Sequence, residues 1–257
     1  MMPPVLYRYR PWSVVKADGS ERKSIGEIEE RFAYFSSPLR FNDPQDSLLG
    51  PEFVGGKGDI DRLAFHGLAG ALRLAREKGC SVIELDRRDP DVRAAAEAHQ
   101  RREARSKTCV LCLSWDWRSP LVWTFYAQEH QGFCLGYSTD SKLLRRARPV
   151  LYTHSPEDVL HLRHTAARDD PLSFCKSTDW EFEREWRVCL PQPGPNRVSL
   201  AREKLVSVHT GYRMKDSQLQ GLVAALRKGG YKPEETKLYV MERIPMSFVL
   251  CERAIHW

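Results

Sequence analysis

Three glutamates occupy alternate positions in the segment DWEFEREWRV, residues 179–188. If this segment is a strand, alternate side chains share a face, so Glu181, Glu183 and Glu185 form an acidic row with neighbours about 7 Å apart. Carboxylates in a pocket can accept a proton or stabilise a positive charge, whereas the same row on an open strand is a solvated surface. The segment by itself leaves both interpretations open.

A second group of candidate residues lies in the helix that we predict after Ser119, a helix-capping residue followed by proline. Trp123, Tyr126, Ala127 and His130 have the spacing of one helix face. This face is either part of the core, with polar partners for the Tyr and His tips, or a stacking surface for a flat ring.

Two arginines alternate with two tyrosines near the N-terminus, in VLYRYRP. The alternation predicts a strand with Tyr7 and Tyr9 on one face and Arg8 and Arg10 on the other. Paired guanidinium groups suit a phosphate or a carboxylate, and they are equally compatible with a surface position.

Polar side chains also gather between residues 34 and 46, in YFSSPLRFNDPQD. The Asn42–Asp43–Pro44 sequence predicts a turn, because Asn and Asp side chains bond local backbone and proline fixes φ. Ser36 and these two residues would satisfy one another locally or face a ligand.

Composition excludes several classes of protein. The chain of 257 residues has a net charge of +6, and no apolar run approaches the length of a membrane span. The N-terminus has no secretory h-region, so we expect a cytoplasmic protein. Standard phosphate-binding loops, zinc-ligand spacings and hydrolase nucleophile motifs are missing. Two arginine-rich segments, 87–105 and 142–148, are either solvated faces or sites of phosphate contact.

Strand-like segments lie at both ends of the chain, and helical patterns lie between and after them. Residues 59–107 have two helical patterns, one ending at Gly79 and one rich in alanine and arginine. We predict an α+β fold with a mixed, mostly antiparallel sheet and packed helices. Residues 1–257 would form a single domain, with 59–107 as a helical insertion.

Four motifs, taken in order, resemble one bacterial family, called domain of unknown function 2971. They are LYRYR at 6–10, FSSPLRFNDPQD at 35–46, LSW with SPLVWTFYAQEHQGFCLGY between 113 and 137, and KSTDWEFEREWRV at 176–188. Two positions depart from the family pattern, since Arg8 stands where lysine is usual and Val122 where methionine is common. The name of this family does not specify an activity.

A fold-level resemblance is to the ADP-ribosyltransferases, in which a first-strand basic residue, a Ser- or Tyr-bearing strand and a late glutamate, often in E-x-E, follow in that order. This chain has the same order of features, with Arg8 first, then residues 34–37, and then the pair Glu183 and Glu185. The resemblance implies an ADP-ribosyltransferase-like core that cleaves NAD, with both glutamates catalytic. The residues that it implies for NAD binding are Arg8, Tyr34, Ser36, Asn42, Asp43, Trp123, Tyr126 and His130.

The resemblance also implies an acceptor, either nucleic acid or protein, held by segments 87–105 and 142–148, and a role as a toxin or phage-defence effector. Two alternatives stay open. One is a non-enzymatic nucleic-acid-binding or sensing module. The other is a metal-dependent nuclease with Asp43, Glu183 and Glu185 as ligands.

Overall fold

A computed structural model describes residues 2–15, 19–43, 46, 108–154, 171–191, 196–247 and 249–257. The predicted insertion at 59–107, including the arginine-rich segment 87–105, lies outside the described residues.

The described elements are strands with three α-helices and several 3-10 turns. The strands are β1 (Val5–Arg10), β2 (Ser13–Val15), β3 (Glu21–Lys23), β4 (Phe32–Tyr34), β5 (Thr108–Ser114), β6 (Phe133–Ser138), β7 (Arg148–Pro149), β8 (Leu151–Thr153), β9 (Cys175–Ser177), β10 (Glu185–Pro191), β11 (Arg197–Ser199), β12 (Leu205–Thr210), β13 (Lys237–Arg243) and β14 (Leu250–Ile255). The α-helices are α1 (Gly26–Glu29), α4 (Pro120–Tyr126) and α6 (Asp216–Lys228).

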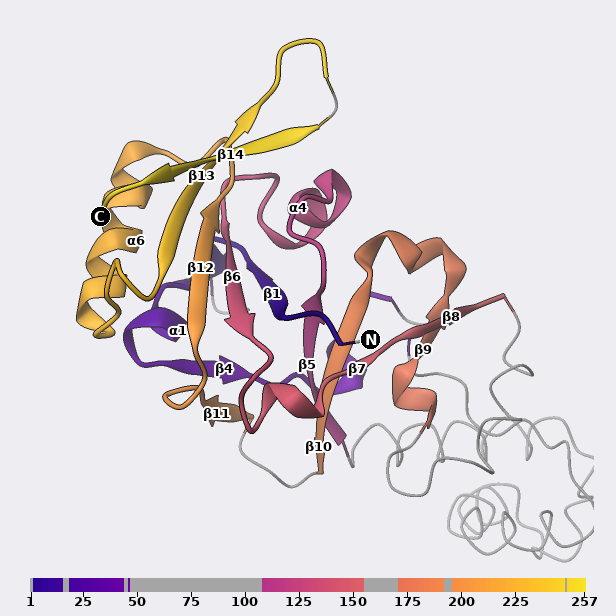
Figure 1. Cartoon of the computed structure of the whole chain (residues 1–257). Coiled ribbons are helices and arrows are strands. Elements are labelled where there is room, and N and C mark those ends of the chain that lie inside the picture. The colour runs from indigo at the N-terminus through magenta and orange to yellow at the C-terminus, as the bar shows by residue number, and fades with distance from the viewer. Residues whose placement is uncertain are drawn as a thin grey trace, which may run out of the picture.

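Eight strands form one sheet, in the order β14-β13-β12-β6-β1-β5-β10-β7 (Figure 1). Within this sheet β12 and β13 run parallel, and the other described pairs are antiparallel. The prediction of an α+β fold with a mixed, mostly antiparallel sheet is therefore confirmed.

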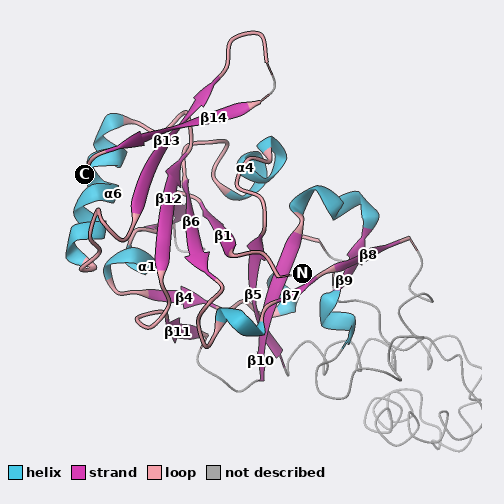
Figure 2. Cartoon of the chain, in the orientation of Figure 1, coloured by secondary structure: helices cyan, strands magenta, loops and turns pink. Residues whose placement is uncertain are grey.

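Each face of the sheet has its own core. Figure 2 shows the helices α1, α6 and α4, in cyan, beside the magenta strands of the sheet. On one face, Leu6, Phe133 and Leu135 pack with buried residues of α1 and α6. On the other face, Tyr9 and Cys134 pack with buried residues of α4. The predicted alternation of β1 explains how one strand contributes to both cores.

The start of α4 fits the sequence signals that predicted it. The side chain of Ser119 caps α4 by accepting a hydrogen bond from the backbone of Val122, and Pro120 occupies the first helical position. α6 buries Leu222, Ala225 and Leu226 against the sheet. None of the described helices has the length and apolar character that a membrane crossing requires.

Candidate functional site

A split in the sheet creates the site. In the described part of the chain, β1 and β5 pair at one position, Tyr7 with Ser114, although each pairs with its other neighbour along most of its length. Further along β5, the backbone of Ser36 exchanges two hydrogen bonds with Val110, both 2.8 Å long. β1 and β5 therefore separate beyond Tyr7, and the residues around Ser36 close the far end of the gap.

A cavity of about 410 Å³ occupies this gap, within the size range of small-molecule sites. Its lining comes from both strands and from segments that border them. The lining residues are Tyr7, Arg8, Tyr9, Arg10, Tyr34, Ser36, Arg40, Phe41, Asn42, Asp46, Val110, Cys112, Leu113, Ser114, Val122, Phe125, Tyr126, Lys176, Glu183 and Glu185.

The cavity reaches both faces of the sheet. Glu185 and Tyr7 both pair with Ser114, so their side chains lie on one face. Arg8 and Arg10 alternate with Tyr7 and point to the opposite face. Because all of these residues line the cavity, it passes through the opening between β1 and β5. The two arginines and the glutamates are thus at different ends of one space.

The acidic segment that we predicted as a continuous strand has two different conformations. Residues Thr178–Glu183 form a 3-10 helix, Arg184 is left-handed with φ 48°, and the strand begins at Glu185. The strand prediction for 179–188 is therefore wrong in its first half. As a result, Glu181 is exposed, whereas Glu183 and Glu185 are each 5% exposed.

Two hydrogen bonds between side-chain hydroxyls and the backbone hold the junction on either side of Arg184. The hydroxyl of Ser114 donates to the carbonyl of Glu183 at 2.7 Å, and the backbone N–H of Glu185 donates to the hydroxyl of Tyr152 at 2.7 Å. In a continuous strand, Glu183 and Glu185 would reach the cavity from the same face of one element. The left-handed residue between them ends that element, so Glu183 comes from a helical turn and Glu185 from a strand, and both carboxylates line the cavity.

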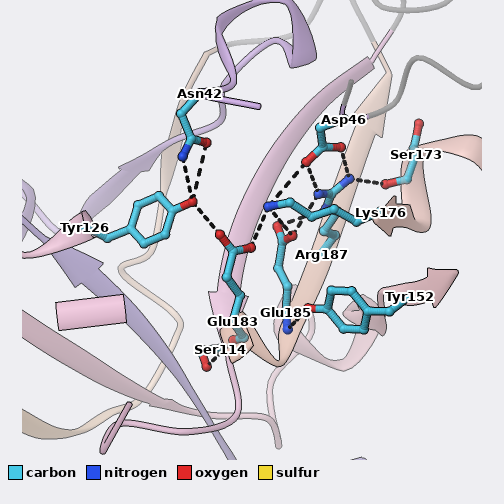
Figure 3. Close-up of polar contacts among 10 residues, drawn as sticks. All are labelled: Asn42, Asp46, Ser114, Tyr126, Tyr152, Ser173, Lys176, Glu183, Glu185 and Arg187. Carbon is cyan, nitrogen blue, oxygen red and sulfur yellow. Dashed lines mark hydrogen bonds and ion pairs between the residues drawn. The ribbon is translucent and has the colours of Figure 1, made fainter. Parts of the chain in front are cut away.

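A buried ion network surrounds Glu185 (Figure 3). Arg187 donates to both oxygens of Glu185, at 2.9 and 2.7 Å, and to both oxygens of Asp46, at 2.9 and 2.6 Å. The ammonium of Lys176 lies 2.5 Å from Glu183, 3.6 Å from Asp46 and 3.8 Å from Glu185. All five side chains are almost completely buried.

The two glutamates have opposite pKa shifts. Burial and the nearby charge of Glu185 raise the pKa of Glu183, and its bonds to Lys176 and Tyr126 offset this only in part. Burial also acts to raise the pKa of Glu185, but the ion pair with Arg187 outweighs it and lowers that pKa. Two carboxylates with separated pKa values are suited to different roles, one titrating and one permanently ionised.

Glu183 is the carboxylate with a hydroxyl partner inside the cavity. Tyr126 donates to Glu183 Oε1 at 2.5 Å and accepts from the side-chain amide of Asn42 at 3.0 Å. Burial and the charge of Glu183 raise the pKa of Tyr126, so its hydroxyl keeps its proton. Tyr126 therefore stabilises the ionised form of Glu183 and orients it.

We predict that Tyr126→Phe shifts the pH dependence of any reaction in which Glu183 accepts a proton. Activity should fall as the pH drops through the raised pKa of Glu183. Removing the Tyr126 hydroxyl raises that pKa further, because a donor to the ionised form is lost. The acid limb of kcat/KM against pH should move to higher pH, while Tyr212→Phe, outside the cavity lining, leaves it in place. An unshifted limb in Tyr126→Phe contradicts this role.

At the other end of the cavity, two arginines share one buried carboxylate. Glu27 lies 3.2 Å from Arg8 Nε and 2.8 Å from Arg10 Nη2. Arg8 also donates to the backbone carbonyl of Tyr34 at 3.2 Å. Burial, followed by repulsion from Arg8, lowers the pKa of Arg10 to about 10, so the Arg10 guanidinium is charged at neutral pH.

Of the sequence-predicted NAD-binding residues, five line the cavity, namely Arg8, Tyr34, Ser36, Asn42 and Tyr126, and so do both predicted catalytic glutamates. Asp43, Trp123 and His130 are not among the lining residues. Asp43 is buried and has partners of its own.

Trp123 and His130 belong to the core beneath the cavity. α4 ends at Tyr126, and three successive residues, Gln128, Glu129 and His130, have positive φ, so the predicted helix face does not continue to His130. The His130 ring instead stacks on Trp123 at 5.9 Å, and Trp123 Nε1 donates to the carbonyl of Trp117. The expectation that Trp123, Tyr126 and His130 share one helix face is therefore wrong.

Sequence reasoning missed two central residues, Lys176 and Asp46. Both lie within the motifs that resemble the bacterial family, but nothing in their local pattern distinguishes a buried cation or carboxylate from a surface one. Lys176 occupies the space between the three carboxylates that a metal ion would need. Among the described residues, no group of three or more His, Cys, Asp and Glu side chains is arranged to hold a metal.

Comparison with family models, curated proteins and solved structures gives no match to this chain. Membership of the bacterial family and kinship with ADP-ribosyltransferases therefore stay predictions. The function has to be argued from the geometry and charge of the cavity.

Proposed function

We propose that the protein is an ADP-ribosyltransferase-like enzyme that cleaves NAD and transfers ADP-ribose to an acceptor. One observation carries the proposal: Arg8, Ser36, Tyr126, Glu183 and Glu185, which come from distant parts of the sequence, line a single cavity. The resemblance to ADP-ribosyltransferases implies that a basic residue, a hydroxyl-bearing segment and the late glutamates meet in one place.

The distribution of charge along the cavity supports the choice of NAD. At one end, two arginines face one glutamate, so these three side chains together carry an excess of one positive charge. At the other end, Asp46, Glu183 and Glu185 face Lys176 and Arg187, which leaves an excess of one negative charge when all are ionised. NAD has the complementary arrangement, with an anionic diphosphate and a cationic nicotinamide ring.

In the proposed reaction, the bond between the ribose carbon and the nicotinamide nitrogen breaks, and its electron pair neutralises the nicotinamide ring. The ribose becomes oxocarbenium-like, as in glycosidic cleavage. A nucleophilic atom of the acceptor then bonds to the ribose carbon and releases a proton. The products are nicotinamide and ADP-ribosylated acceptor, with the proton taken up by the enzyme.

The two glutamates have distinct roles in this scheme. Glu185, held ionised by Arg187, stabilises the positive charge that develops on the ribose. The pKa of Glu183 is raised toward neutral pH, and Glu183 accepts the proton of the acceptor. Tyr126 and Lys176 fix the orientation of Glu183.

Aromatic contact in this proposal comes from residues other than Trp123. Phe125 lines the cavity and is 59% exposed, and it packs against Phe182 and Trp180, with ring centroids 6.0 and 6.4 Å away. A flat ring at the cavity mouth would stack against Phe125.

The basic segment 142–148 supports a polyanionic acceptor such as nucleic acid. Lys142, Arg145, Arg146 and Arg148 are exposed. The setting that we propose is a toxin or phage-defence effector.

The decisive experiment measures release of nicotinamide from NAD by chromatography, with transfer of labelled ADP-ribose to nucleic-acid and protein fractions. We expect nicotinamide release by the wild-type protein and label on an acceptor. Absence of both NAD binding and nicotinamide release, with every acceptor supplied, refutes the proposal. Salt-sensitive binding to nucleic acid without NAD chemistry would instead identify a binding module.

A further inference from the structure

We propose that Arg10 is a second phosphate ligand, which together with Arg8 makes this end of the cavity a site for a diphosphate rather than a single phosphate. The inference deepens the proposed function and rests on it only for the identity of the diphosphate as that of NAD.

Arg10 is mostly buried and leaves a donor unused. Its side chain is 17% exposed, and its Nε atom has no hydrogen-bond partner in the described part of the chain. The contact with Glu27 brings the charges together at 2.8 Å, but Glu27 Oε1 is itself without a hydrogen bond to any described residue. The Nε atom is itself enclosed by the protein, so it is the terminal nitrogens of Arg10, a residue that lines the cavity, that would meet a ligand.

Glu27 holds the pair in place without neutralising it. One oxygen meets Arg8 and the other meets Arg10, so a single carboxylate spaces two guanidinium groups on the same face of β1. The side chain of Glu27 is 3% exposed and does not line the cavity. Its role is to position the arginines, and one positive charge remains for a ligand.

A third arginine lines the same cavity. Arg40 lines the cavity, is exposed and forms no ion pair with a described residue. Guanidinium groups bind phosphate oxygens in a fork geometry that one ammonium cannot reproduce. Three guanidinium groups in the lining of one cavity suit a ligand with several phosphate oxygens spread over two phosphorus centres.

The test compares binding of inorganic pyrophosphate, inorganic phosphate and nicotinamide by calorimetry, at constant ionic strength. Wild type should bind pyrophosphate at least about tenfold more tightly than phosphate, since one more charge-assisted hydrogen bond contributes about that factor. Arg10→Gln should lose about tenfold to a hundredfold in pyrophosphate affinity and leave nicotinamide binding unchanged. Arg10→Lys keeps the ion pair with Glu27 and controls for folding; it should recover only part of the affinity, because the fork is lost.

Equal affinity for pyrophosphate in wild type and Arg10→Gln overturns the inference, as does a wild type that binds pyrophosphate no better than phosphate. Arg197→Gln, on the exposed pair with Glu30, is the surface control and should bind like wild type. The outcome separates the two proposals. Arg10-dependent pyrophosphate binding without NAD cleavage supports the diphosphate site and refutes the proposed function. NAD cleavage that is unchanged in Arg10→Gln supports the proposed function and refutes the diphosphate site.

Discussion

Glu183→Gln should lower kcat for NAD cleavage coupled to transfer by about a hundredfold to ten-thousandfold, the usual contribution of a positioned general base. The amide keeps the size of the side chain, and its oxygen can accept from Lys176 while its NH2 group donates to the Tyr126 hydroxyl, so the cavity should keep its shape. What it loses is the capacity to take the acceptor proton. The acid limb of the pH–rate profile should disappear with it. Steady-state nicotinamide release over a pH series measures both effects.

Glu181→Gln is the matched control, because Glu181 lies two residues away in the same 3-10 helix and is exposed. It should retain wild-type kcat and the wild-type pH profile. If Glu183→Gln keeps wild-type activity, or if both variants lose it equally, then Glu183 is not the proton acceptor. Unchanged nicotinamide binding in Glu183→Gln distinguishes lost chemistry from a collapsed cavity.

The second large effect concerns stability. Arg187→Leu should lower the free energy of unfolding by about 3–5 kcal/mol, because it leaves buried carboxylates without their cation. Arg187 is 0% exposed and donates to both Glu185 and Asp46, each of which is 5% exposed or less. Lys176 cannot compensate for both, since its closest contact is already with Glu183. Urea unfolding at neutral pH, followed by fluorescence and circular dichroism, measures the change.

Arg184→Ala is the comparison for this variant. Arg184 is three residues away, and its ion pair with Asp116 is exposed, so its loss should cost at most about 1 kcal/mol. Similar losses in the two variants would mean that burial does not set the strength of the Arg187 network. Raising the salt concentration should weaken the Arg184 pair and leave the Arg187 network almost unchanged.

Local patterns were enough to predict most of the elements. The alternation in VLYRYRP predicted Tyr9 and Arg8 on opposite faces, as found in β1. Ser119 and Pro120 marked the start of α4 correctly. These predictions succeeded because they depend on backbone periodicity and capping, which neighbouring residues determine.

The candidate site was predictable only in part, for two physical reasons. Alternation cannot reveal a single left-handed residue such as Arg184, yet that residue decides which glutamates reach the cavity. Similarly, the prediction of a helix face that extends to His130 was wrong, because the helix ends at Tyr126 and the chain turns there. Lys176 and Asp46 join the site through contacts between distant segments, which no local pattern contains.

The split between β1 and β5 also has a consequence for how the molecule folds. Each half of the sheet is a continuous ladder, and in the described residues the strands of the two halves pair only at Tyr7 with Ser114, although both halves contribute to one hydrophobic core. That pairing closes a long loop of chain, so its entropic cost comes before the core contacts between the two halves can offset it. We expect the two ladders to form first and to dock late. The cavity would then come into existence only in the last step of folding, when the ladders meet.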